Sequence, residues 1–223
     1  MLIHPWDRGA RRESLDFLRA QGFGQLVASG RGRDTAVVVP TQFLVADDDT
    51  VLLHLARPNP VWEAIAENPT VLLCATGDWA YVPSQWNEVP TTYYAAVQLT
   101  CEATVLDDPA EKTEVLRRQL GVLEQDAEDY DFAAQHRLLP GLRALHLSVR
   151  EVTGKFKYGG NQDADYRRRI STELATRNAP GDAAARCQLE RRLAAERPAE
   201  RPADGLAGQL AAGRPLFGGA GRQ

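Results

Sequence analysis

The sequence predicts a mainly β protein with peripheral helices, in which a six-stranded antiparallel barrel is followed by a helical C-terminal arm. Three observations support this fold class. Three short β-like segments follow one another between residues 24 and 56, separated by clusters of Gly and Asp. Two longer segments, 92–107 and 142–159, alternate apolar and polar residues. The helical patterns between them are few and short, so strands dominate.

The predicted strands follow the chain as a meander. GQLVAS, TAVVVPTQFLVA and VLLHLA are joined by the turns GRGRD and DDDT, which is typical of antiparallel neighbours. Pro40 interrupts the second segment, and because proline cannot donate to a ladder it indicates an edge strand or a bulge. TVLLCATG is the fourth strand, and the two long alternating segments complete the six. The segment 79–91, rich in aromatic residues and proline, is expected to be an irregular loop.

Helices are predicted at the edges of this sheet. A short one spans residues 13–21 and ends at Gly22, and another starts at Asn59 and Pro60. A third follows a cap at Asp107 or Asp108, and Lys112 on it is expected to be exposed. Residues 165–196 form two helices split by NAPGD. We therefore divide the chain into a barrel domain at 1–164, a helical arm at 165–196 and a disordered tail at 197–223.

Composition limits the classes of function. The chain has 223 residues, 43% of them hydrophobic, with a formal net charge of −4. No apolar run approaches the ~18 residues of a membrane span, and the N-terminus lacks the features of a secretion signal, so we expect a cytoplasmic protein. The first 164 residues carry 15 basic and 23 acidic side chains, which disfavours direct DNA binding by the barrel. The arm is mildly basic, and its run Arg167–Arg169 is either a solvated helix face or a contact for DNA or another regulator.

The three cysteines do not form a metal-binding pattern. Cys74, Cys101 and Cys187 are widely spaced and none belongs to a CxxC pair, which argues against structural zinc. Cys74 and Cys101 lie in apolar or alternating runs, so we expect both to act as small core hydrophobes. Cys187 is expected on a helix surface.

Two segments are candidate anion sites. Lys155 and Lys157 are two of only three lysines and share one face of a strand, where they form either a solvated strand end or a site for a phosphate or acidic ligand. His54 to Trp62 spans a strand-to-helix junction, where Arg57 beside a helix N-terminus is a plausible phosphate site. Most helix starts bind nothing, and a lone strand histidine such as His54 is commonly a hydrogen-bonded core or interface residue.

Aromatic residues gather in the third candidate segment, 80–94. Tyr81, Trp86, Tyr93 and Tyr94 with their hydroxyl-bearing neighbours either enclose a planar ring or form a packed loop. The Rossmann, P-loop, zincin and hydrolase motifs are all absent.

At these residues the sequence resembles the PaiB-type FMN-binding negative transcriptional regulators, relatives of the pyridoxamine-phosphate-oxidase-like split barrels. The resemblance covers about residues 1–175 and rests on four segments in the family's order: His54–Trp62, Tyr81–Trp86, Val89–Tyr94, and Gly154–Lys157 with Asn161.

The resemblance implies a homodimer of six-stranded FMN-binding split barrels, with FMN bound noncovalently in a cleft between subunits. By position, His54, Ala56, Arg57 and Asn59 would lie at the phosphate and ribityl end, with Lys155 and Lys157 nearby. The segment of Pro40, Thr41 and Gln42 would face the flavin ring, and Tyr93 is included among the cofactor-binding residues. Such a protein is either a negative transcriptional regulator or a flavin-dependent oxidoreductase.

The same family also contains haem-dependent enzymes that join two nitrogen atoms, the piperazate-synthase-like members. In that alternative haem replaces FMN, and His54 is the candidate axial ligand because imidazole suits iron. No catalytic acid or base can be assigned from the sequence, and no metal ligand set is expected.

Overall fold

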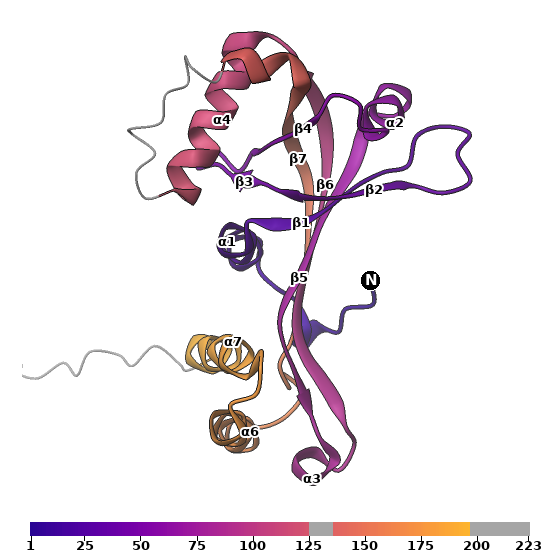
Figure 1. The fold of residues 1–223 in the computed structure, drawn as a ribbon. Helices are drawn as coiled ribbons and strands as arrows, with labels where there is room; N and C mark the ends of the chain where they lie inside the picture. Colours follow the sequence, from indigo (N-terminus) through magenta and orange to yellow (C-terminus); the bar gives the residue numbers. More distant parts are fainter. Residues whose placement is uncertain (125–135, 197–223) are drawn as a thin grey trace, which may run out of the picture.

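A computed structural model describes residues 1–124 and 136–196 of the chain (Figure 1). Its seven strands form one antiparallel sheet in the order β2-β1-β5-β6-β7-β4-β3. The strands are β1 (Phe23–Ala28), β2 (Val37–Gln42), β3 (Leu44–Val45), β4 (Val51–Ala56), β5 (Thr70–Val82), β6 (Thr91–Leu106) and β7 (Leu142–Lys157). The predicted class, an antiparallel split barrel with peripheral helices, is confirmed, although the sheet itself is not closed.

The count of seven strands instead of six has a local cause. β2 and β3 are parts of one chain segment, interrupted at Phe43, whose N–H donates to the carbonyl of Gly22. β2 pairs with β1 at one edge of the sheet, and β3 pairs with β4 at the other edge. The chain therefore passes from one edge to the other through a single residue. Pro40 lies on the edge strand β2 opposite Gln25, as its missing N–H predicts.

Helices cover the barrel and its lower extension. They are α1 (Arg11–Gln21), α2 (Val61–Glu67), α3 (Ser84–Asn87), α4 (Pro109–Leu123), α6 (Ala164–Arg177) and α7 (Asp182–Ala195), with 3-10 turns at Pro5–Asp7 and His136–Gly141. Asp108 caps α4 by accepting from the N–H groups of Ala110 and Glu111. No described helix is long and apolar enough to span a membrane. The expected tail beyond residue 197 lies outside the described residues.

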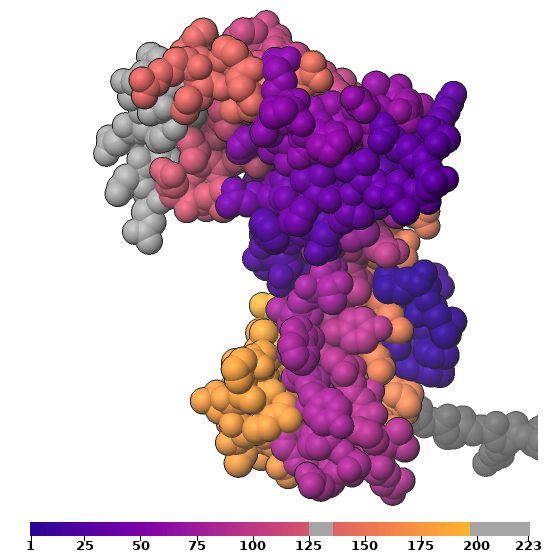
Figure 2. All heavy atoms as spheres, turned by 45° about the vertical axis from the view of Figure 1, so that its right-hand side comes forward, coloured from indigo at the N-terminus to yellow at the C-terminus, as the bar shows by residue number. Residues whose placement is uncertain are grey.

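Long strands divide the molecule into two lobes. β5, β6 and β7 leave the barrel and continue downward to α3, where α6 and α7 pack beside them, and the molecule narrows between the lobes (Figures 1 and 2). The expected loop at 79–91 is wrong for residues 79–82, because β5 continues after a bulge between Gly77 and Ala80. It is also wrong for Ser84–Asn87, which form α3, and for Thr91, where β6 begins. Asp78 occupies this bulge with a φ of 49°, and its carboxylate accepts from the amides of Gln21 and Gln188. Through these hydrogen bonds, helices α1 and α7 fix the path of β5 at the bulge.

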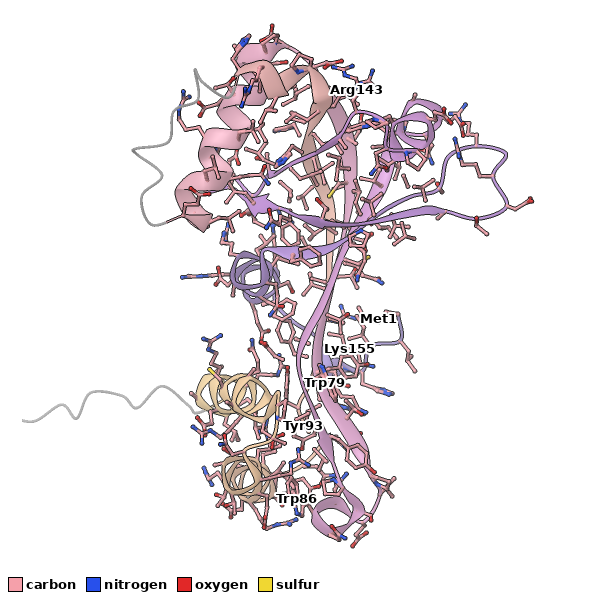
Figure 3. All side chains as sticks on the ribbon, viewed as in Figure 1. Met1, Trp79, Trp86, Tyr93, Arg143 and Lys155 are labelled. Atoms are coloured by element: carbon pink, nitrogen blue, oxygen red, sulfur yellow. The ribbon has the colours of Figure 1, made fainter. Side chains whose placement is uncertain are left out.

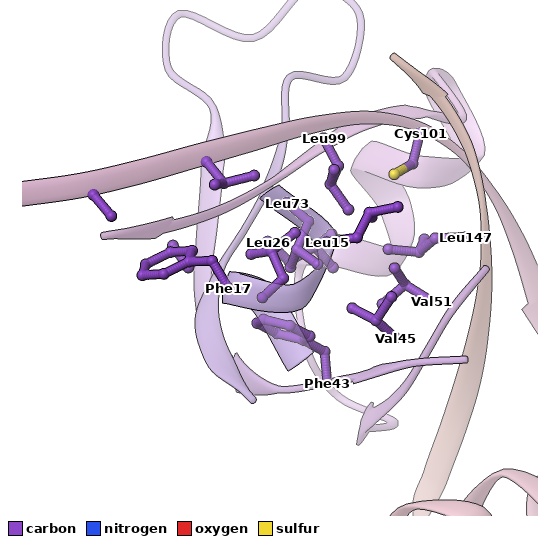
Figure 4. Close-up of a cluster of buried hydrophobic side chains, with 14 of the residues drawn as sticks. Leu15, Phe17, Leu26, Phe43, Val45, Val51, Leu73, Leu99, Cys101 and Leu147 are labelled. Carbon is purple, nitrogen blue, oxygen red and sulfur yellow. The ribbon is translucent and has the colours of Figure 1, made fainter. Parts of the chain in front are cut away.

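One hydrophobic core runs through both lobes. In the barrel, side chains from α1 and the strands meet around Leu26, Leu73 and Leu99 (Figure 4). Ile170 and Leu174 of α6 and Ala185 and Leu189 of α7 belong to the same cluster. Of the two cysteines predicted to be core residues, Cys101 is fully buried.

Cys74 is the exception among the predicted core cysteines. It is only half-buried and alternates with the buried Leu73 and Ala75 of β5. Its side chain therefore lies on the outer face of the sheet, because neighbouring residues of a strand point to opposite faces. The prediction of a core position was wrong for this residue.

Gly24 is required by the close approach of β1 and β5. A Cβ at this position would lie 2.3 Å from the carbonyl oxygen of Cys74, a backbone atom that cannot move without breaking the ladder. We expect Gly24→Ala to lower the free energy of unfolding by about 1–3 kcal/mol, as overpacking of a core does. Urea denaturation measures the change.

Gly121→Ala is the matched control for this prediction. Nothing lies within 4 Å of a Cβ at Gly121, which sits on α4. Alanine there should stabilise the protein by about 0.5–1 kcal/mol, because glycine weakens a helix. Equal effects of the two substitutions would show that the approach of β1 to β5 is not tight.

Candidate functional site

The residues predicted to bind a cofactor fall into two separate regions. Those of β2, β4 and the following turn belong to the barrel, whereas Tyr93, Lys155 and Lys157 belong to the lower parts of β6 and β7. Figure 3 shows this separation, with Arg143 at the top of the barrel, Lys155 at the waist, and Tyr93 and Trp86 in the lower lobe.

Arg57 belongs to a charged group at the top of the barrel. Its guanidinium donates to both carboxylate oxygens of Asp107, and its Nε donates to the carbonyl of Pro140 at 2.7 Å. Asp107 also accepts from Arg143 and Lys112. We call these four residues the Asp107 cluster. Three cations surround one carboxylate, so the cluster carries excess positive charge, and the side chains of Arg57 and Arg143 are about one-third exposed.

Lys112 is not the exposed residue that the sequence predicts. Its side chain is 3% exposed, and its Nζ donates to the carbonyls of Leu139 and Leu142 as well as to Asp107. The sequence does not reveal the burial of Lys112. Lysine is seldom buried without partners, so a lysine on a helix is expected at the surface. Lys112 is therefore a structural residue of the cluster.

The turn after β4 satisfies its own polar groups. Asn59 accepts through its side chain from the N–H of Val61, the first residue of α2. The carbonyl of Ala56 accepts from the indole Nε1 of Trp62 and from the N–H of Asn59. α2 is only seven residues long, so the strength of this turn as an anion site rests on Arg57 and not on the helix start.

His54 points away from the barrel interior toward α4. Its Nδ1 lies 2.7 Å from Oε1 of Gln119, and because a carboxamide oxygen only accepts, Nδ1 carries the proton. His54, Gln119 and Gln42 line a pocket of about 260 Å³, which we call the His54 pocket, with leucines for most of its wall. The predicted pair of Gln42 and His54 is thus brought together.

The other residues of β2 lie on an uncharged sheet surface. Of the predicted three, Thr41 is buried and its hydroxyl donates to the carbonyl of Gln42, whereas Pro40 and Gln42 are exposed. The register aligns two cross-strand rows, one of which includes Pro40, and on β7 these rows end at Thr153 and the charged Glu151. Across β2, β1, β5 and β6, none of their eight side chains is charged. We call this surface the outer sheet face: Pro40, Gln25, Cys74, Gln98, Val38, Val27, Leu72 and Thr100.

The lower lobe contains a second, larger pocket. It has a volume of about 680 Å³ and lies between the N-terminal turn, the β5–β6 connection, the end of β7 and α6. We call it the lower pocket, and its walls include Trp6, Trp86, Tyr93 and Tyr166. Three of the four segments that carry the family resemblance contribute to it, through Trp86, through Val89 to Tyr93, and through Lys157 with Asn161.

The two predicted lysines of β7 make different contacts. Nζ of Lys157 donates to the hydroxyl of Thr91 at 2.7 Å, at the wall of the lower pocket. Nζ of Lys155 donates to the carbonyl of Leu2 and lies 5.6 Å from the centre of the Tyr94 ring. Tyr93 is buried beside Tyr158, and burial raises the pKa of its phenol. The described structure therefore gives each lysine a partner of its own.

Sequence reasoning missed Asp107 and Arg143 at the barrel and Asp7 in the lower lobe. Asp107 was considered only as a helix cap, although an acid directly between a strand and a helix can also face neighbouring arginines. Arg143 starts the last strand, where a charged residue gives no distinctive signal. Asp7 lies in the segment HPWD, which no motif rule covers.

The Asp107 cluster makes stability depend on acid pH. The hydrogen bond from Arg57, aided by Lys112, lowers the pKa of Asp107 from 3.8 to about 2. Because the folded pKa lies below the unfolded value, the stabilisation is complete above about pH 4 and is lost as the pH falls toward 2. We expect Asp107→Asn to be less stable than the wild type at neutral pH, with a difference that shrinks between about pH 4 and 2 in urea titrations. If the difference in unfolding free energy between the wild type and Asp107→Asn stays constant over this pH range, the lowered pKa does not belong to Asp107.

Five arginines of the arm have partners in the described part of the chain. Arg167 bonds to Glu196, Arg168 to Asp165, and Arg169 to the carbonyl of Trp86. Arg177 pairs with Asp182, and Arg192 pairs with Glu13. The run at 167–169 therefore contributes to the contacts of α6 in the described structure.

Comparisons with known proteins agree with this architecture. Residues 2–151 match the family model described as "Putative FMN-binding domain". Among solved structures, the FAD and haem binding protein of Mycobacterium smegmatis superposes with a TM-score of 0.59 at 18% identity, covering 73% of this chain and 78% of that one. The flavocytochrome Anf3 of Azotobacter vinelandii gives 0.57 at 18% identity, covering 73% and 75%. No curated protein is significantly similar in sequence. The chain belongs to the family of FMN-binding domains with the split-barrel fold.

Proposed function

We propose that the protein is a homodimeric flavoprotein that binds FMN noncovalently between two copies of the chain. The outer sheet face carries this proposal. A quarter of the chain is charged, yet none of the eight residues of this face is, and Val38 and Leu72 are 55% and 37% exposed. The face of an antiparallel sheet that is exposed to water normally carries polar and charged residues. A contiguous uncharged surface is what a second copy would cover.

A shared site also explains the separation of the candidate residues. The barrel residues and the lower-lobe residues lie in different lobes of one chain. A two-fold dimer that pairs the outer sheet faces would bring the lower lobe of one copy toward the barrel of the other. One cofactor could then contact both sets of residues.

The residues of the barrel fit a phosphate-bearing flavin. The excess positive charge of the Asp107 cluster suits the phosphate, which Arg57 and Arg143 would hold with charge-assisted hydrogen bonds. Pro40 and Gln42 would border the ring system, and the uncharged sheet face would exclude water from it. When bound, the flavin itself supplies the redox chemistry of the site.

Absorbance and sedimentation of the purified protein test this proposal together. We expect a flavin band near about 450 nm after incubation with FMN, and a dimer that FMN stabilises. FAD added in parallel distinguishes the two flavins. A protein that stays colourless after excess FMN would overturn flavin binding, and a stable monomer that binds FMN would overturn the shared site.

Haem is the second candidate cofactor, and the His54 pocket favours it. Since Nδ1 of His54 donates to Gln119, the Nε2 atom holds the lone pair, and within the described residues it has no hydrogen-bond partner. Leu116, Leu120 and Leu142 supply an apolar wall of the kind that surrounds haem. In this alternative His54 is the axial ligand of a haem-dependent enzyme.

Titration with haemin tests this alternative directly. We expect a band near about 400 nm in the wild type that is lost in His54→Ala. Gln119→Glu, which keeps an acceptor for Nδ1, should retain the band with a changed reduction potential. Equal spectra for the wild type and His54→Ala would exclude this histidine as the ligand.

A regulatory role would be exerted through flavin state or through a protein partner. The pairing of the arm arginines favours this route over direct DNA contact. Retention of the full chain on promoter DNA at about 150 mM salt tests the point, because binding driven by phosphates falls steeply with salt. Retention that disappears when residues 165–223 are deleted would restore the arm as a DNA contact.

A further inference from the structure

Asp7 is a buried carboxyl group in the wall of the lower pocket. The residue is 3% exposed, and it ends the 3-10 turn formed by Pro5–Asp7. Its side chain makes no hydrogen bond or ion pair with any residue that the structure describes, although its backbone N–H donates to the carbonyl of His4. Its carboxylate oxygens are not among the fully buried polar atoms without a partner, so they are open to the pocket, where a hydrogen-bond donor of a ligand can reach them.

The surroundings of Asp7 restrict the charge of that ligand. Burial raises the pKa of the carboxyl, and the positive charges of Lys155, His4, Lys157 and Arg192 act against this. Lys157 and Arg169 line the same pocket, so its wall carries two cations besides Asp7. A cationic ligand would be repelled by them, so the missing partner is an uncharged N–H donor.

The walls of the lower pocket restrict the shape of the ligand. Four aromatic side chains line it, from the N-terminal turn, α3, β6 and α6. The guanidinium carbon of Arg177 lies 4.7 Å from the centre of the Trp86 ring and packs over one face of the indole, which fixes the position of the ring. Flat aromatic walls favour a planar ring through stacking. The pocket volume of about 680 Å³ leaves room for a ring with a sugar-sized substituent.

Several polar groups of the pocket already have partners within the described chain. Lys157 donates to Thr91, Arg169 donates to the carbonyl of Trp86, and the hydroxyl of Tyr166 donates to Asn87. Glu88 also lines the pocket but is exposed, so Asp7 is the buried acid of this wall that lacks a donor in the described structure.

We propose that the lower pocket binds an uncharged, planar heteroaromatic compound whose adjacent N–H groups donate to Asp7, as the edge of a guanine or an aminopyrimidine does. A carboxylate accepts two parallel N–H bonds from such an edge, which sets the orientation of the ring between the aromatic walls. This site is additional to the barrel part of the flavin site; it shares Tyr93 and Lys157 with the lower-lobe candidates and adds Asp7, Trp6 and Tyr166.

Quenching of tryptophan fluorescence by guanosine tests the site, because Trp6 and Trp86 line it. We expect saturable quenching by guanosine and at least tenfold weaker binding of inosine, which lacks the second N–H donor. Asp7→Asn should weaken guanosine binding at least tenfold. The same substitution should raise the thermal stability of the ligand-free protein at neutral pH, because it removes a carboxyl whose ionisation burial opposes.

Asp165→Asn is the matched control, since Asp165 is an exposed acid on α6 paired with Arg168. It should leave guanosine binding unchanged. FMN binding, measured in parallel, should be the same in the wild type and Asp7→Asn.

Two outcomes would overturn the inference. One is the absence of guanosine binding, or equal binding by the wild type and Asp7→Asn. The other is loss of FMN binding in Asp7→Asn, which would assign the lower pocket to the flavin. A wild type that binds guanosine and no flavin would instead remove the proposed flavin function and leave this site standing.

Discussion

Leu72→Arg is expected to convert the dimer into monomers and to abolish FMN binding. Leu72 lies near the middle of the outer sheet face, opposite Val27 on one side and Thr100 on the other. In a two-fold interface the substitution is present twice, and each arginine would be buried without a partner. An interface of this obligate kind covers about 2,000 Å² or more, so one central charge pair of like sign is enough to open it. Sedimentation and flavin fluorescence measure the two effects.

Val105→Arg provides the control for this experiment. Val105 is 40% exposed on β6, close to the 37% of Leu72, but it lies outside the outer sheet face. Its substitution should leave the dimer and FMN binding intact. If Leu72→Arg also stays dimeric and binds FMN with unchanged affinity, the two copies must meet elsewhere.

The elements of the barrel were predictable because their signals are local. VLLHLA is bounded by turn residues on one side and by a helix cap on the other, and β4 has the predicted limits, Val51–Ala56. Pro40 placed its strand at an edge for a reason of backbone chemistry alone. The class of fold followed from the number and order of such segments.

The continuation of β5 was not predictable from local signals. Trp79 to Val82 precede Pro83 in a segment rich in aromatic residues and proline, which indicates a loop. The strand forms there because Ala80 and Tyr81 pair with Tyr93 and Thr92, and because α1 and α7 hold the bulge at Asp78. These contacts join parts of the chain that are far apart in sequence. The long lower lobe, and with it the lower pocket, depends on them.

The candidate site was predictable in its residue types but not in its arrangement. Arg57 and His54 were identified from a segment that spans a strand-to-helix junction, and both have defined partners in the structure. Their partners Asp107 and Gln119 are 50 and 65 residues away in sequence. A pairing over such a distance leaves no pattern in one sequence.

Arg57→Ala is expected to weaken FMN binding by about 10- to 100-fold, whereas Lys112→Met is expected to weaken the fold and spare the cofactor. Charge-assisted hydrogen bonds to a phosphate contribute about 1.5–3 kcal/mol, and Arg57 is exposed enough to make them while its partner Asp107 fixes its orientation. Lys112 is 3% exposed and donates to two carbonyls and Asp107, so a ligand cannot reach its Nζ.

The two variants separate the roles of the cluster because they change different measurements. Lys112→Met keeps the aliphatic volume but leaves the carbonyls of Leu139 and Leu142 without a donor, which should lower the free energy of unfolding by about 1–3 kcal/mol. Urea denaturation reports that loss, and flavin fluorescence quenching below the unfolding transition reports affinity. Equal losses of FMN affinity in the two variants would place the phosphate away from Arg57, because the buried lysine and the exposed arginine share only Asp107.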